Sequence, residues 1–127
     1  ITADARHLSL KTTFDRILID APCSSLGILS HHPDLRWRRR ESDIHDLSHL
    51  QSALLTQAAN HIRPGGTLVY STCTLEPEEN EEIVEAFLHN HPNFYIDRAS
   101  HEYPYLSLLP HQTNNDGVFA ARLRRDS

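Results

Sequence analysis

Apolar residues are spaced in two ways along the chain, and each spacing predicts one type of element. Consecutive apolar residues, several of them β-branched, occupy the middle of residues 14–20 and of residues 67–73. Such runs are typical of strands that are covered on both faces, as in a parallel sheet. Ligands bind at the carboxyl ends of the strands in open α/β sheets. We therefore expect Asp20, Cys23 just beyond it, and Cys73 to face one cleft.

The segment between these strands has an apolar residue at every third or fourth position, which predicts a helix with one buried stripe. Ser42 or Asp43 can cap its amino end. Residues 63–66, Arg-Pro-Gly-Gly, end it because proline cannot continue a helix and glycine allows the turn. A strand, a helix and a strand in this order form a right-handed parallel β-α-β unit. The stripe comprises Ile44, Leu47, Leu50, Leu54, Ala58 and Ile62.

The second half of the chain is predicted to hold one more helix and two more strands. The helix begins at Pro77, because proline suits a first helical turn. We interpret the glutamates within residues 76–82 as solvated groups that favour the positive amino end of this helix. The remaining segments are a strand end with a loop at 1–13, a long loop at 21–40, a strand at 94–97, an irregular segment at 99–116 and a strand at 118–123. Long loops in compact domains are usually functional.

Length and composition narrow the classes of protein that this chain can represent. With 127 residues, 39% of them hydrophobic, the chain forms one globular domain at most. It has no apolar run that could span a membrane and no signal peptide at its start, so we expect no membrane partner. Two cysteines without an export signal indicate the reducing cytoplasm and chemistry rather than a disulfide. The chain contains no methionine, and we interpret it as a piece of a longer protein.

The net charge is −5, which argues weakly against general attraction to nucleic acid, but one short segment is strongly basic. Arg36, Arg38, Arg39 and Arg40 surround the single tryptophan, Trp37. Such a cluster is either a solvated face or a phosphate-binding patch. The tryptophan and the position beside the expected cleft favour phosphate contact.

The two cysteines are the candidates for covalent chemistry. A thiol with a usual pKa of about 8.5 becomes a nucleophile when a cation or a helix amino terminus lowers that pKa. Cys73 lies just before the predicted second helix, and Cys23 follows Pro22. One thiolate can attack while a second group completes the turnover, although a buried, unreactive cysteine is the common alternative. His45 and His49 are one helical turn apart, but no third ligand stands at a metalloprotease spacing, so we expect no metal.

Five motifs, in this order, resemble the Sun (Fmu) family of RNA cytosine-5 methyltransferases. They are Asp20-Ala21-Pro22-Cys23-Ser24, His32-Pro33-Asp34-Leu35-Arg36-Trp37, the segment from Pro64 to Thr74, Pro77-Glu78-Glu79-Asn80-Glu81 and Asp116-Gly117-Val118-Phe119-Ala120. The resemblance implies an α/β fold, the carboxyl-terminal portion of a doubly wound Rossmann-like methyltransferase sheet that ends in an antiparallel hairpin. It also implies S-adenosylmethionine as the cofactor and RNA, in particular ribosomal RNA, as the substrate.

The resemblance also implies a role for each site residue. Cys73 is the thiol that adds to carbon 6 of cytosine, so that carbon 5 can take a methyl group. Cys23 assists release of the methylated base. Asp20 holds the polar edge of the cytosine, the cofactor, or both. Asp4 and Pro22 are expected at the cofactor.

One departure from the family concerns the cofactor pocket. The glycine-rich cofactor loop and the ribose-binding acid of the family have no match in this chain. The resemblance therefore implies that residues 1–127 are a partial catalytic domain, without the upstream RNA-binding region, and inactive alone. Its exposed sheet edge is expected to pair with a second copy. Two alternatives remain open, a DNA cytosine-5 methyltransferase with Cys23 as nucleophile and a non-catalytic RNA-binding fragment.

Overall fold

The computed structural model describes residues 3–38, 40–98 and 103–127, except for the side chains of Arg36 and Arg38. Its helices are the short 3-10 helices η1 (Ala5–His7), η2 (Leu26–Ile28) and η3 (Pro77–Glu79), and the α-helices α1 (Leu35–Arg38), α2 (Glu41–Ala59), α3 (Glu81–Asn90) and α4 (Pro110–Thr113). Its strands are β1 (Phe14–Asp20), β2 (Ile62–Thr72), β3 (Phe94–Ile96), β4 (Tyr105–Leu108) and β5 (Val118–Arg125). None of the helices in these ranges combines the length and the apolar character needed to cross a bilayer.

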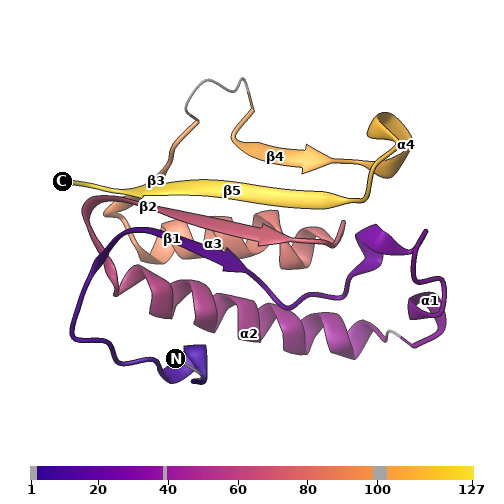
Figure 1. Cartoon of the computed structure of the whole chain (residues 1–127), viewed down its shortest axis with the longest axis horizontal. Helices are drawn as coiled ribbons and strands as arrows, with labels where there is room; N and C mark the ends of the chain where they lie inside the picture. The colour runs from indigo at the N-terminus through magenta and orange to yellow at the C-terminus, as the bar shows by residue number, and fades with distance from the viewer. Residues whose placement is uncertain (1–2, 39, 99–102) are drawn as a thin grey trace.

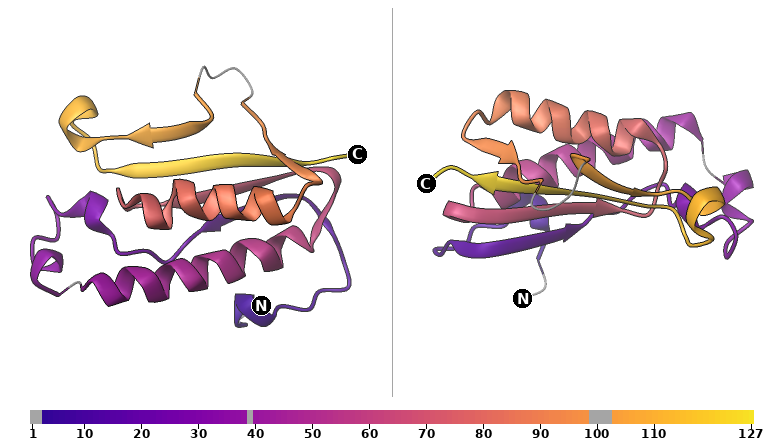
Figure 2. Two further views of the ribbon diagram at one scale, coloured as in Figure 1. Left: turned by 180° about the vertical axis from the view of Figure 1, so that it is seen from behind. Right: turned by 90° about the horizontal axis from the view of Figure 1, so that it is seen from above.

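The strands form one mixed sheet in which β2 and β5 are central (Figure 1). β1 pairs with β2 in parallel, with Ile17 opposite Leu68, and α2 is the crossover between them. This confirms the predicted β-α-β unit. β5 runs antiparallel to β2, and both β3 and β4 pair with the other edge of β5. Figure 2 shows α2 and α3 together on one side of the sheet.

The core lies between those two helices and the sheet. Alternate residues of the two central strands point into it, among them Leu68, Tyr70, Phe119 and Leu123, all at most 1% exposed. Each fully buried side chain of this size contributes about 1.5–3 kcal/mol. The Tyr70 hydroxyl donates a hydrogen bond of 2.6 Å to a backbone oxygen of η3, so the buried phenol is paired.

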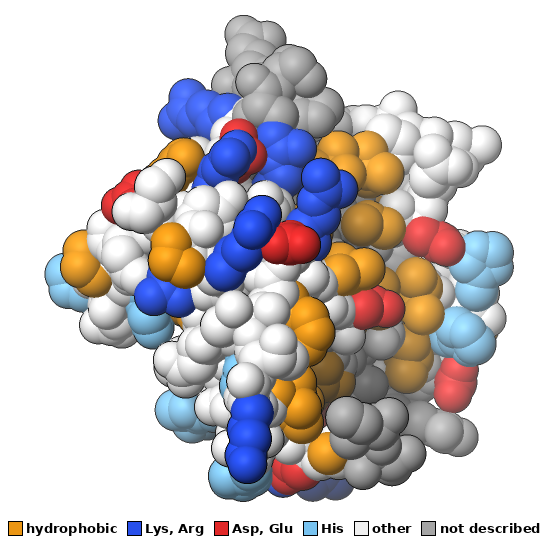
Figure 3. All heavy atoms as spheres, turned by 60° about the vertical axis from the view of Figure 1, so that its left-hand side comes forward, with side chains coloured by type: hydrophobic (Ala, Val, Ile, Leu, Met, Phe, Trp, Pro, Cys, Tyr) orange, Lys and Arg blue, Asp and Glu red, His pale blue; other side chains and the backbone are white. Residues whose placement is uncertain are grey.

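The opposite face of the sheet is covered by no helix among the described elements (Figure 2). Leu18 of β1 points to this face and is 68% exposed, and the register places Val69 and Arg122 beside it. Figure 3 shows basic side chains gathered next to exposed hydrophobic ones at this side of the molecule. β1 is also an edge strand, because β2 is its one partner in the described sheet.

The first long helix differs from the prediction in its end and in its buried residues. It ends at Ala59, and Ile62 begins β2 instead of closing the helical stripe. Its fully buried residues are Gln51, Leu55 and Ala59, whereas the predicted apolar stripe is half-buried beside them. The buried row is displaced by one residue from the predicted Leu50, Leu54 and Ala58. It includes the polar Gln51, whose burial depends on hydrogen bonds to distant residues.

Other boundaries also differ. The strand end predicted within residues 1–13 is not found in residues 3–13, where Asp4 caps the 3-10 helix η1, and residues 1 and 2 lie outside the described residues. The segment 99–116 was expected to be irregular, but it contains β4 and α4, and its residues 99–102 lie outside the described residues. The long loop 21–40 includes the short helices η2 and α1. The helix expected at Pro77 starts as η3 and becomes α-helical at Glu81.

Candidate active site

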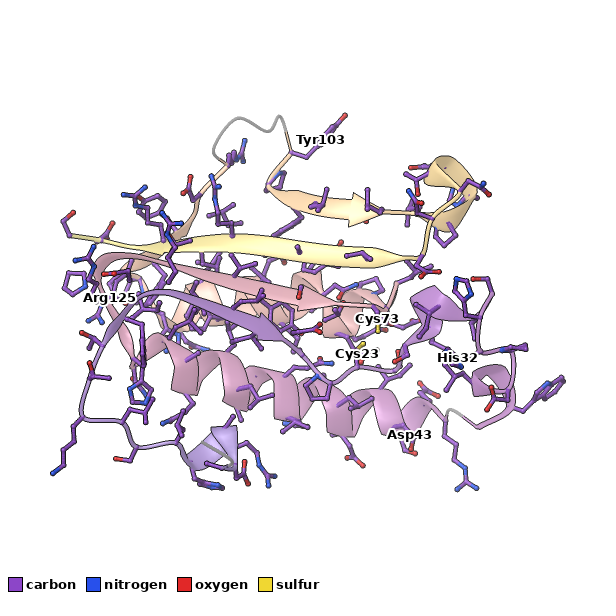
Figure 4. The ribbon with its side chains drawn as sticks, in the orientation of Figure 1. Cys23, His32, Asp43, Cys73, Tyr103 and Arg125 are labelled. Atoms are coloured by element: carbon purple, nitrogen blue, oxygen red, sulfur yellow. The ribbon has the colours of Figure 1, made fainter. Side chains whose placement is uncertain are left out.

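The two cysteines lie together past the carboxyl ends of β1 and β2 (Figure 4). Since the two strands are parallel, their ends meet at the same edge of the sheet. The Sγ atoms of Cys23 and Cys73 are 3.2 Å apart, and the Cys73 backbone N–H donates to Cys23 Sγ over 3.3 Å. Both thiols are free. The predicted convergence of the two sulfurs is therefore confirmed.

The two thiols differ in exposure, and Cys23 is held in its protonated form. Cys23 is buried, at 7% exposed, whereas Cys73 is half-buried. Burial, and next the hydrogen bond with Cys73, raise the pKa of Cys23 from 9.0 to about 11. At neutral pH, Cys23 is therefore a thiol that can donate a hydrogen bond, and Cys73 is the more exposed of the two residues.

Ser25 places a hydroxyl group beside both thiols. Its Oγ lies 3.4 Å from Cys73 Sγ, within range of an S–H donor, and 4.0 Å from Cys23 Sγ. Its backbone is left-handed, with a φ of 62°, which costs a non-glycine residue about 1–2 kcal/mol. Strained residues of this kind cluster at functional sites, where the surrounding structure holds them in place.

Two glycines allow η2 to approach Cys73 and the start of β5. The Gly27 N–H donates to the Cys73 carbonyl over 3.0 Å, and the Gly117 N–H donates to the Gly27 carbonyl over 2.8 Å. A Cβ atom on Gly27 would lie 2.5 Å from the Gly117 oxygen and 2.7 Å from the Cys73 oxygen. Only glycine fits at this position, so backbone contacts fix the loop after Cys23 against the end of β2.

A group of buried polar residues behind the thiols was missed by the sequence interpretation. Ser24, Gln51 and Thr74 are fully buried, and so is Glu79. The interpretation of the glutamate run as solvated is wrong for Glu79, although it holds for its exposed neighbour Glu78. No local pattern distinguishes the two glutamates, because the hydrogen-bond partners of Glu79 come from residues 28 and 55 positions away.

Asp20 and Pro22 line an apolar groove beside β1. The groove has a volume of about 540 Å³ and lies between β1, α2 and the segment that contains η1. Ala5, Leu8 and Leu54 also line it, and neither cysteine is among its described lining residues. Asp20 therefore stands at the end of a mainly apolar surface, close in sequence to Cys23.

The Asp4 side chain is paired with Arg6, two residues further along the chain. Its carboxylate forms an ion pair of 2.6 Å with Arg6, which holds the pKa of Asp4 well below its usual range. The side chain also accepts a hydrogen bond of 3.0 Å from the Arg6 backbone N–H and thereby caps η1. Asp4 does not line the groove, but the next residue, Ala5, does.

The basic segment lies at the same end of the sheet as the thiols. Figure 1 shows α1 beyond the ends toward which β1 and β2 run. The Trp37 side chain is 85% exposed there, and Arg40, also exposed, immediately precedes α2. Arg39 lies outside the described residues, as do the side chains of Arg36 and Arg38.

Comparison with known proteins assigns this arrangement to a family. The sequence profile described as 16S rRNA methyltransferase RsmB/F matches residues 1–124. The chain belongs to this family. The Cronobacter sakazakii protein named ribosomal RNA small subunit methyltransferase B is 48% identical over 114 residues, which are 89% of this chain and 27% of that protein. The chain therefore spans about a quarter of the length of the curated relatives that it matches.

Two solved structures show the same fold. NSun6 from Pyrococcus horikoshii with SFG matches with a TM-score of 0.88 and 33% identity, over 100% of this chain and 34% of that one. A methyltransferase homolog protein from Pyrococcus horikoshii matches with a TM-score of 0.76 and 31% identity, over 90% of this chain and 40% of that one. These likenesses confirm the predicted α/β class and the Rossmann-like methyltransferase sheet.

Proposed function

We propose that this chain is the carboxyl-terminal part of the catalytic domain of an RNA cytosine-5 methyltransferase, which uses S-adenosylmethionine on ribosomal RNA in the cytoplasm. The observation that carries the proposal is the pair of thiols 3.2 Å apart at the ends of two parallel strands. The family membership and the names of the relatives support the RNA substrate class. Among the described elements, no helix covers the outer sheet face and no strand pairs with the outer edge of β1, which supports a larger catalytic domain.

The sulfur of Cys73 performs the addition step in this proposal. Carbon 5 of cytosine is a poor nucleophile, so the Cys73 thiolate first forms a bond to carbon 6 and turns the ring into an enamine. Carbon 5 then takes the methyl group as the bond between that group and the cofactor's sulfonium sulfur breaks, which would leave a neutral thioether. Loss of the carbon 5 proton to a water molecule restores the ring and expels Cys73 as a thiolate. Cys73 suits this role because it is the half-buried thiol, whereas Cys23 is enclosed.

Cys23 assists the last step as a hydrogen-bond donor. Its raised pKa keeps the proton on Cys23, and its sulfur lies 3.2 Å from the sulfur that must leave. A protonated thiol at this distance stabilises the Cys73 thiolate as the carbon–sulfur bond breaks. The same burial and raised pKa argue against Cys23 as the nucleophile, which is the role that the DNA methyltransferase alternative requires.

The groove beside β1 is the proposed cofactor surface. Its apolar lining suits a purine ring, and the Asp20 carboxyl at one end suits a hydroxyl or ammonium group. S-adenosylmethionine, when bound, supplies an electrophilic methyl group. Asp20 and Pro22 would hold the cofactor from this chain, with Asp4 positioning the η1 segment through Arg6. The remainder of the pocket would come from the upstream part of the catalytic domain.

Trp37 and the neighbouring arginines are the proposed RNA contacts. An exposed tryptophan offers a stacking surface for an unpaired base, and arginines neutralise phosphates. The target base must leave any helical stack to reach Cys73, which favours a loop or remodelled RNA as the substrate.

Substitution of each thiol tests the assignment in the full-length protein. Cys73→Ala is expected to abolish methyl transfer to RNA. Cys23→Ala is expected to accumulate a covalent protein–RNA adduct, visible as a shifted band on a denaturing gel, because the leaving thiolate loses its donor. Ser52→Ala, at an exposed position of α2, is the matched control and should behave as the unmodified protein. An adduct with Cys73→Ala and no activity with Cys23→Ala would instead support the DNA-type mechanism, and binding without methyl transfer would support the non-catalytic alternative.

A further inference from the structure

The residues that directly follow the two cysteines are joined to one another. Ser24 follows Cys23, Thr74 follows Cys73, and both are fully buried. Their hydroxyl oxygens are 2.7 Å apart, across 50 positions of sequence. The two loops that present the thiols are thus connected one residue behind the sulfurs.

The carboxyl group of Glu79 holds the Cys23 loop from the inside. Its Oε1 accepts the Ser24 backbone N–H at 2.8 Å, and its Oε2 accepts the Ser24 hydroxyl at 2.5 Å. Its Oε1 also accepts Gln51 Nε2 at 2.9 Å, and the same nitrogen donates to the Pro22 carbonyl at 2.9 Å. Both neighbours of Cys23 are therefore tied to one buried carboxyl group.

Glu79 is itself anchored to the segment that follows Cys73. Its backbone oxygen accepts the Tyr70 hydroxyl from β2 at 2.6 Å. The next residue, Asn80, donates from Nδ2 to the Thr74 carbonyl at 3.0 Å, and its Oδ1 accepts the Thr72 hydroxyl at 2.5 Å. Glu79 thus bridges the two loops, with one end of the residue fixed to the Cys73 side and the carboxyl fixed to the Cys23 side.

A buried carboxyl group costs free energy unless hydrogen bonds satisfy it, and an apolar residue in its place would avoid that cost. The Glu79 carboxyl accepts three hydrogen bonds and is satisfied, whereas Gln51 Oε1 in the same group has no partner among the described residues. A satisfied buried carboxyl holds its partners in one arrangement. We infer that Glu79 is a positioning residue that sets the spacing of Cys23 and Cys73. It touches no sulfur and acts through Ser24 and the Pro22 carbonyl.

The first test measures the environment of Cys23 and is independent of methyl transfer. The full-length protein is treated with iodoacetamide at pH 8, and the alkylation of each cysteine is followed by peptide mass spectrometry. Glu79→Ala and Ser24→Ala are expected to raise the alkylation rate of Cys23 by about tenfold, because a loosened loop exposes the thiol and lowers its pKa toward the usual value. Glu79→Gln should stay close to the unmodified protein, since the amide retains the Ser24 N–H bond.

Two control variants separate positioning from general destabilisation. Glu78→Ala removes the exposed neighbour in the same turn and should leave Cys23 protected. Leu123→Ala destabilises the core opposite Leu68, away from the Cys73 end of β2, and should leave the relative reactivity of the two thiols unchanged in the folded protein. If Glu79→Ala does not fold, Ser24→Ala carries the test, because it deletes one hydroxyl group. The control for Cys23 alkylation is Glu78→Ala. If folded Glu79→Ala, or Ser24→Ala in its place, shows the same alkylation rate of Cys23 as this control, the inference is overturned.

The second test rests on the proposed function. In methyl transfer, Glu79→Ala should lower kcat by about a hundredfold with little change in the KM for RNA, because a small displacement of reacting groups has an effect of this size. Glu79→Gln should recover most of the rate. A Glu79→Gln rate as low as that of Glu79→Ala would contradict a role through hydrogen-bond geometry. If the unmodified protein shows no methyl transfer, the proposed function fails, and the alkylation result alone decides the role of Glu79.

Discussion

The region beyond the carboxyl end of β1 and the outer side of the same strand differ in how completely their groups are buried and paired. Beyond the carboxyl end, polar groups such as Ser24 and Glu79 are fully buried and paired, and two thiols are fixed in contact. Along the outer side, Leu18 is exposed, no described strand pairs with the outer edge of β1, and an apolar groove is open. The thiol site is therefore built within this chain, whereas the proposed cofactor surface is only partly built by it. The two regions should respond differently to substitution and to isolation of the chain.

The largest effect on stability is expected at the thiol end. Gly27→Ala places a Cβ atom 2.5 Å from the Gly117 oxygen, so a backbone segment must move. We expect a loss of about 3 kcal/mol in the free energy of unfolding, measured by urea denaturation. Gly65→Ala is the control, because its left-handed φ of 74° is strained but the nearest atom is 3.9 Å away. That variant should lose only about 1 kcal/mol. Equal losses in the two variants would show that the thiol end is no more constrained than the far end of β2.

Separating residues 1–127 from the rest of the protein should weaken ligand binding at the groove more than it changes the arrangement of the thiols. We expect residues 1–127 alone to bind S-adenosylmethionine at least about a hundredfold more weakly than the full-length protein, equivalent to about 2.7 kcal/mol. Calorimetric titration measures both, with circular dichroism to establish that the isolated chain is folded. Equally tight binding by the isolated chain would contradict the proposal that the pocket needs an upstream part.

The unpaired edge of β1 is proposed to join two copies of the isolated chain. An exposed strand edge with an exposed leucine is a template for pairing. Sedimentation equilibrium should therefore show a dimer of the isolated chain, and Leu18→Lys should weaken it about tenfold or more. Ser52→Ala on α2 should leave the association unchanged. A monomer at all concentrations would exclude the proposed pairing.

The last effect concerns the ionisation of Cys23 and appears only at alkaline pH. Because the folded state raises its pKa from 9.0 to about 11, folding favours the neutral thiol. The resulting contribution to stability is complete below about pH 9 and is lost as the pH rises toward 11. Urea denaturation across this range should show a steeper decline for the unmodified protein than for Cys23→Ala. Parallel declines would mean that Cys23 is not shielded from solvent in the folded state.

The site was predictable from sequence as far as its two thiols, and not in the residues that hold them. Cys23 and Cys73 each follow a recognisable strand, and parallel strands bring their ends together. Gln51 and Glu79 are typical surface residues by type, and they become buried because residues from other segments supply hydrogen bonds. A short segment of sequence does not contain these partners, so it cannot predict that the two residues are buried.

By itself, the sequence determined the β-α-β unit, the second helix and the last strand, because apolar spacing acts within one element. Only the tertiary structure decided that Glu79 is buried while Glu78 is exposed, and that residues 105–108 form a strand. β4 exists because β5 offers it an edge, with Tyr105 opposite Ala121. The physical reason is the same in both cases: the stabilising partner lies far away in the sequence and arrives only when the chain folds.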